Sequence, residues 1–86
     1  MHFQGAIIEE QHVKFAVVIV KEHVLQSTHS ANKAIRSFAP MFPGLPVILM
    51  AQDHRGVPSY YGHKDISSFL AKVPLRAIPW REYTCN

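Results

Sequence analysis

The sequence predicts an α+β domain built on a five-stranded mixed sheet, with elements in the order β-β-α-β-β-α-β and two helices packed on one face. Two observations carry this prediction. The apolar runs FAVVIV at residues 15–20 and PVILMA at residues 46–51 do not alternate with polar residues, which is typical of interior strands covered on both faces. Two further segments have apolar residues at helical spacing. The sequence therefore predicts a sheet whose centre is buried from two sides.

The first two strands are expected to form a hairpin. Residues 3–10 have strand character, and Gln11 and His12 leave only a tight connection to a second strand over residues 13–21. Because side chains alternate between faces, Val17 and Val18 lie on opposite faces of this second strand. Both faces are apolar, so both are expected to be buried.

Three more strands are predicted in the second half of the chain. Pro58 and Pro79 each lack a backbone N–H group, which favours an edge position for the strands that contain them. The residues Asp53, His54, Arg55 and Gly56 fit a hairpin loop between the third and fourth strands. The three strands are expected at residues 46–51, 58–61 and 77–84.

Two segments are predicted to be amphipathic helices. The first, residues 31–39, follows Ser27, Thr28 and Ser30, any of which suits a helix N-cap, and it ends before Pro40. The second ends before Pro74 and has Asp65 in its first turn, where a negative charge suits the helix dipole. The apolar positions at spacings of three and four are Ala31, Ala34, Ile35 and Phe38 in the first helix and Ile66, Phe69, Leu70 and Val73 in the second.

Length and composition indicate a single globular domain spanning residues 1–86. The chain is 48% hydrophobic and 17% charged, which is ordinary for a packed domain and excludes intrinsic disorder. Its apolar runs are far shorter than the roughly 20 residues that span a bilayer, so no membrane association is expected. No secretion signal is recognised, and the single cysteine, Cys85, has no intramolecular disulfide partner. A cytoplasmic location is expected.

Self-association is predicted from the uncovered face of the sheet. If both helices pack on one face, the other face stays bare in a monomer and exposes a larger apolar patch than monomers usually carry. We therefore expect a homo-oligomer, most simply a homodimer, formed through an apolar sheet face that includes Val18.

The basic residues give only a weak case for nucleic-acid binding. The net charge of +3 comes from nine Lys and Arg residues, which are scattered singly along the chain instead of forming a stripe. Stacking of bases on Tyr60 or Tyr61 would be needed as well. Nucleic acid is therefore the least favoured partner.

The six histidines lack the spacing of a zinc site, and neither a metal nor another cofactor is predicted.

One polar segment is the candidate ligand site. A hairpin here would bring its two ends together, so that a carboxylate, imidazoles, a guanidinium and a phenol share one rim beside the start of the second helix. Such a rim suits a small anion or polar ligand. The candidate residues are Asp53, His54, Arg55, Tyr61, His63 and Lys64.

The sequence favours a small oligomeric binding or interaction protein of unknown ligand over an enzyme. The alternative is a small enzyme or anion-binding protein that uses the rim at residues 53–65. For catalysis, Asp53 and His54 would need a nucleophile, and the nearest hydroxyl, that of Ser59, is in no recognisable nucleophile motif.

Overall fold

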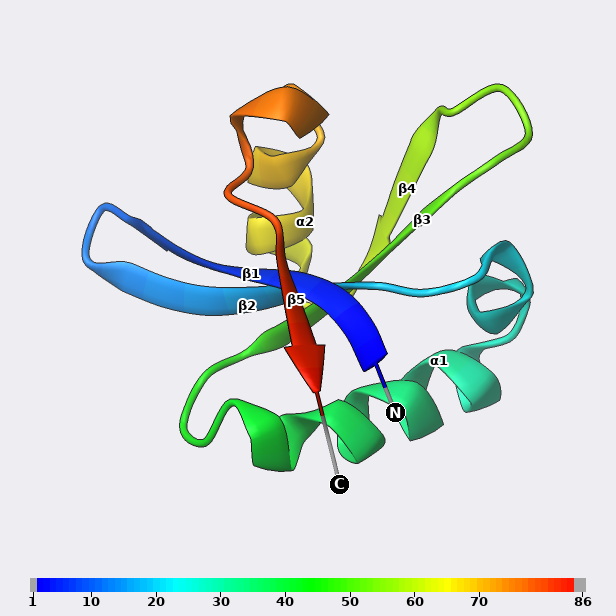
Figure 1. The fold of residues 1–86 in the computed structure, drawn as a ribbon, viewed down its shortest axis with the longest axis horizontal. Helices are drawn as coiled ribbons and strands as arrows, with labels where there is room; N and C mark the ends of the chain where they lie inside the picture. The colour runs from blue at the N-terminus through cyan, green and yellow to red at the C-terminus, as the bar shows by residue number, and fades with distance from the viewer. Residues whose placement is uncertain (1, 85–86) are drawn as a thin grey trace.

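The computed structural model describes residues 2–84, and Cys85 lies outside this range. Five strands form one sheet in the order β4-β3-β2-β1-β5, with two α-helices packed on it (Figure 1), so the predicted α+β fold with a five-stranded mixed sheet is confirmed. The elements in chain order are β1 (His2–Glu10), β2 (Val13–Ile19), η1 (Glu22–Gln26), α1 (Thr28–Phe38), η2 (Ala39–Met41), β3 (Val47–Gln52), β4 (Pro58–Tyr61), α2 (Lys64–Leu70), η3 (Leu75–Ala77) and β5 (Arg81–Thr84).

The strand pairing follows the predicted hairpin and edge positions. β1 and β2 pair antiparallel with Glu10 opposite Val13, whereas β2 and β3 are parallel neighbours. β4, which begins at Pro58, and β5 occupy the two edges, although Pro79 lies before β5 and not within it as expected. The last strand is shorter than expected, because residues 75–77 form a 3-10 turn and the ladder begins only at Arg81.

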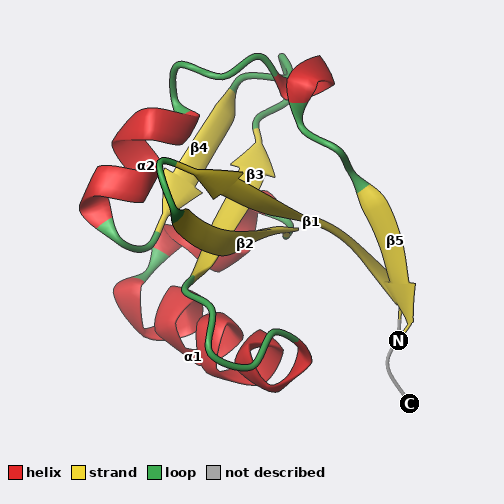
Figure 2. Cartoon of the chain, turned by 90° about the vertical axis from the view of Figure 1, so that its left-hand side faces the viewer, coloured by secondary structure: helices red, strands yellow, loops and turns green. Residues whose placement is uncertain are grey.

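The two helices lie on opposite faces of the sheet, which corrects the expectation that both share one face. α1 packs on a cluster that contains Ala16, Val18 and Leu49, and α2 packs on the other face, against Phe15 and Val17. Figures 1 and 2 show the sheet between them. The rule of right-handed crossovers concerns α1, which joins the parallel strands β2 and β3. It does not concern α2, which leads from one edge strand to the other.

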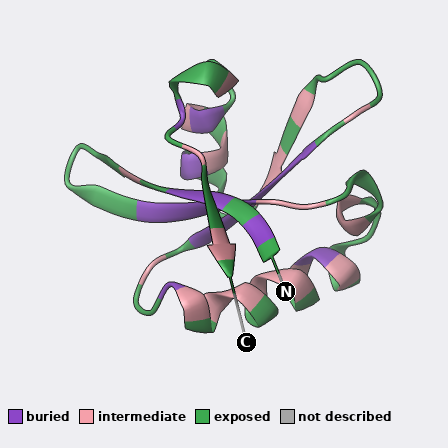
Figure 3. Ribbon diagram, viewed as in Figure 1, coloured by how far each residue is buried: buried purple, intermediate pink, exposed green. Residues whose placement is uncertain are grey.

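This arrangement also corrects the predicted interface. Val18 is 0% exposed, because it lies in the apolar cluster beneath α1 together with Ala31 and Leu49. Buried residues run through the central strands and the inner sides of both helices (Figure 3). One chain therefore covers both faces of its own sheet, and self-association would have to use another surface.

The start of α1 shows how local sequence fixes an element. The Ser27 hydroxyl accepts a hydrogen bond of 3.0 Å from the backbone N–H of Ser30, so Ser27 is the N-cap among the three predicted candidates. The helix therefore begins at Thr28, three residues before the predicted start. Within residues 2–84, no helix is long and apolar enough to cross a membrane.

Candidate functional site

The six residues of the predicted rim are divided between the two ends of β4. Asp53, His54 and Arg55 lie in the loop between β3 and β4. The other three, Tyr61, His63 and Lys64, lie where β4 ends and α2 begins. A strand rises by about 3.3 Å per residue, so the four residues of β4 hold the two groups roughly 13 Å apart. The structure does not gather the six side chains at one place.

Asp53 shapes the loop in which it lies. Its Oδ1 accepts hydrogen bonds from the backbone N–H groups of Arg55, at 2.8 Å, and Val57, at 2.9 Å. The same carboxylate is 4.0 Å from the Arg55 guanidinium, at the outer limit of an ion pair. Asp53 therefore stabilises a tight loop through an Asx-type turn. The Arg55 guanidinium remains largely exposed.

Tyr61 also has a structural role. Its hydroxyl donates a hydrogen bond of 3.0 Å to Oδ1 of Asn32 on α1. This bond ties the edge strand β4 to the helix on that face of the sheet. His63 precedes α2 without making a side-chain cap, and α2 itself has only seven residues.

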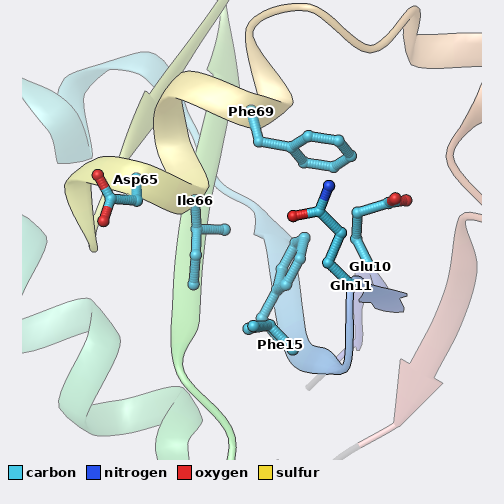
Figure 4. A pocket seen from close by; sticks show the side chains of 7 residues that line it. Glu10, Gln11, Phe15, Asp65, Ile66 and Phe69 are labelled. Atoms are coloured by element: carbon cyan, nitrogen blue, oxygen red, sulfur yellow. The ribbon is translucent and has the colours of Figure 1, made fainter.

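A different feature of the surface has the shape of a binding site. A cavity of about 220 Å³ lies between the β1–β2 hairpin and α2, and we call it the hairpin groove (Figure 4). Its walls come from segments about fifty residues apart in the chain. The lining residues are Glu10, Gln11, Val13 and Phe15 from the hairpin, and Asp65, Ile66 and Phe69 from α2.

The floor of the hairpin groove is apolar. The rings of Phe15 and Phe69 meet edge to face, with centroids 6.4 Å apart and an interplanar angle of 82°. Ile66 is buried beside them. Val13, on the hairpin side of the groove, remains 48% exposed although it is apolar. The groove therefore leaves apolar surface uncovered that a partner side chain would bury.

The rim of the groove is acidic. Glu10 and Asp65 lie at opposite ends, and the Gln11 amide lies beside the two rings (Figure 4). Lys14 does not offset these charges directly, because it pairs with Glu9 in the ladder and so lies on the other face of the hairpin. The lining residues offer two carboxylates and an amide but no hydroxyl, thiol or imidazole.

The turn that carries the groove's outer wall is strained. Gln11 has φ +50° and His12 has φ +68°, so both occupy the left-handed region that Gly and Asn prefer in two-residue hairpins. Such positions cost about 1 kcal/mol each for other residues. The turn directs the Gln11 side chain to the groove (Figure 4).

Sequence reasoning missed the hairpin groove because its two walls are distant in the chain. One signal was present: the period of two places Val13 on the same face as Phe15, beside the turn of the hairpin. The spacing of residues 65–69 predicts a helix, but it does not indicate which face of the sheet that helix covers.

A second cavity, of about 310 Å³, lies beside η1 near the ends of β3 and β4. It lacks an aromatic floor, and most of its lining is polar. The lining residues are Glu22, Leu25, Gln26, Ala51 and Ser59. It therefore offers a partner side chain less apolar surface than the hairpin groove does.

Metal ligation finds no support in the part of the chain that the structure describes. Among residues 2–84, no three His, Cys, Asp or Glu side chains are grouped closely enough to hold a metal ion. Comparisons with models of protein families, with curated proteins and with solved structures gave no match.

Proposed function

We propose that this protein is a small self-associating interaction protein whose hairpin groove receives an apolar side chain of a protein partner. The observation that carries the proposal is the uncovered apolar surface of the groove, in which half-exposed Val13 adjoins the Phe15 and Phe69 rings. Burying apolar surface yields about 25 cal/mol per Å², so a side chain seated there would contribute measurably to association.

The chemistry of the lining supports binding over catalysis. The two carboxylates of the groove, Glu10 and Asp65, lie at opposite ends, and no nucleophile stands among the lining residues. An apolar floor with a polar rim is the usual anatomy of a protein contact site. We include a cytoplasmic location in the proposal, which the single cysteine of the sequence supports.

Two exposed apolar residues allow a matched test. Val13 lines the groove, whereas Ile7, 40% exposed, lies on the other face of the hairpin, opposite Ala16 in the ladder. Sedimentation velocity over a dilution series would give the dimer dissociation constant for the wild type and for Val13→Asp and Ile7→Asp. Both substitutions place a carboxylate at an exposed strand position, so their effects on folding are comparable.

We expect Val13→Asp to weaken self-association at least tenfold, because the new carboxylate loses its water on insertion of a partner side chain. Ile7→Asp is expected to change the constant by less than about twofold. A wild type that stays monomeric up to the highest soluble concentration contradicts the proposal. Equal effects of the two substitutions contradict the assignment of the contact to the groove.

A further inference from the structure

The loop between β3 and β4 carries an exposed apolar side chain, Val57, where the chain returns toward β4 opposite Asp53. Val57 is 51% exposed, which is the largest exposed fraction of any large hydrophobic residue among residues 2–84. The loop projects from the body of the molecule beyond the ends of β3 and β4 (Figure 1). An exposed branched side chain on a protruding loop is suited to enter a small apolar cavity on another molecule.

The loop is held in one shape by its own hydrogen bonds. Asp53 accepts from the N–H groups of Arg55 and Val57, and the Gln52 side chain donates to the Gly56 carbonyl oxygen at 3.0 Å. Gly56, at φ +83°, makes the left-handed bend that closes the loop. Because the loop is already ordered, a partner that binds it need not supply the free energy of ordering it.

The exposed guanidinium of the loop complements the carboxylates of the groove. The Arg55 side chain is 73% exposed, and within residues 2–84 its only ion-pair partner is the Asp53 carboxylate, 4.0 Å away. His54 is exposed beside it. The hairpin groove offers the Glu10 and Asp65 carboxylates on its rim. An exposed guanidinium near an exposed apolar side chain thus matches an apolar cavity that has carboxylates on its rim.

The geometry points to a second copy of the chain as the occupant: we propose that Val57 of one copy enters the hairpin groove of another, with Arg55 against Glu10 on the rim. This inference rests on the proposed function and names its partner. The loop and the hairpin tip lie on different sides of one molecule (Figures 1 and 2), so the contact is between chains. In a two-fold dimer each copy gives one loop and one groove, and the contact is made twice.

A charge reversal tests the pairing. Arg55→Glu and Glu10→Arg each place like charges together, and each is expected to raise the dimer dissociation constant about tenfold. The double variant Arg55→Glu/Glu10→Arg restores opposite charges, and its constant is expected to return to within about threefold of the wild type. All these positions are exposed, and circular dichroism with thermal unfolding would verify that each variant is folded.

Glu9 provides the matched control. It is the neighbour of Glu10 and carries the same charge, but it pairs with Lys14 on the other face of the hairpin. The double variant Arg55→Glu/Glu9→Arg is therefore expected to remain as weak as Arg55→Glu alone. A second variant, Val57→Ser, removes the apolar side chain that enters the groove without changing the charge, and it is expected to weaken the dimer about tenfold.

Rescue by Glu10→Arg but not by Glu9→Arg supports the loop-in-groove contact. Equal rescue by both, no rescue by either, or an unchanged constant for Val57→Ser overturns it. The proposed function fails separately: a monomeric wild type contradicts self-association itself, whereas dissociation by Val13→Asp with no effect at Val57 contradicts only the loop as occupant.

Discussion

The ring of Phe69 on α2 meets the ring of Phe15 on β2 edge to face, with centroids 6.4 Å apart. This contact joins the second helix to the centre of the sheet and forms the floor of the hairpin groove. One pair of rings therefore contributes both to stability and to the proposed binding surface.

Phe69→Ala is expected to lower the free energy of unfolding by about 2 kcal/mol. The substitution removes a partly buried ring and its contact with Phe15, and the loss is below the range for fully buried Phe because Phe69 retains some exposure. Urea denaturation monitored by circular dichroism would measure it. A change below about 0.5 kcal/mol contradicts the packing described for α2.

Gly62→Ala is expected to destabilise the protein by about 2 kcal/mol or more. Gly62 has φ +148°, and an added Cβ would lie 2.6 Å from Cδ1 of Ile48 and 3.3 Å from the Val47 carbonyl oxygen. Gly44→Ala is the control, because Gly44 also has a positive φ but no atom of residues 2–84 lies within 4 Å of its added Cβ. Its cost is expected to be about 1 kcal/mol. Equal losses in the two variants would contradict the close approach at Gly62.

Burial raises the pKa of Tyr60 above its ordinary value of 10.0, and its hydroxyl has no hydrogen-bond partner within residues 2–84. Above pH 10 the unfolded chain loses this proton before the folded chain does, so the free energy of unfolding falls as pH rises. Tyr60→Phe is expected to remove this part of the pH dependence. It is also expected to leave stability near neutral pH unchanged or raised by up to about 1 kcal/mol.

Denaturation of both proteins at pH 8 and pH 11 would test the Tyr60 prediction. Absorbance titration of tyrosinate would show directly whether one of the three tyrosines ionises late and whether that step is absent in Tyr60→Phe. A destabilised variant at pH 8 would indicate that the hydroxyl has a partner after all.

His12→Gly is expected to stabilise the fold by about 1 kcal/mol. His12 has φ +68° in a two-residue hairpin turn, and glycine adopts this conformation without steric cost. The side chain does not line the hairpin groove, so the dimer dissociation constant is expected to stay unchanged. A loss of stability on thermal unfolding would mean that the His12 side chain makes a contact that outweighs the strain.

Much of the fold follows from local patterns in the sequence. Continuous apolar strands predict a sheet buried from both sides, and Pro58 at the start of β4 predicts an edge position for that strand. The helices follow from their spacing. These features depend on residues that are neighbours in the chain, so they can be predicted from a single sequence.

The side of the sheet that α2 covers could not be predicted in the same way. The crossover rule constrains a helix between parallel neighbours, and α2 instead joins β4 to β5 at opposite edges. The amphipathic pattern of Ile66 and Leu70 shows that one helix face is buried, but it does not indicate against which strand face. This error led to Val18 as the interface residue.

The candidate site depended on contacts that sequence order does not reveal. Residues 53–65 are close in sequence, but β4 separates their ends in space. The hairpin groove instead joins Val13 to Phe69 across the length of the domain. A binding surface made from two distant segments can be located only when the position of the helix on the sheet is known.

We propose that the hairpin groove is the surface through which this protein associates. Amide chemical shifts recorded by nuclear magnetic resonance over a concentration series test it most directly, because they report which residues change environment as copies meet. Concentration-dependent shifts are expected at Val13 and Phe69 in the groove and at Arg55 and Val57 in the loop, with little change at Ile7. Shifts centred on Ile7, or none at any concentration, would contradict the account.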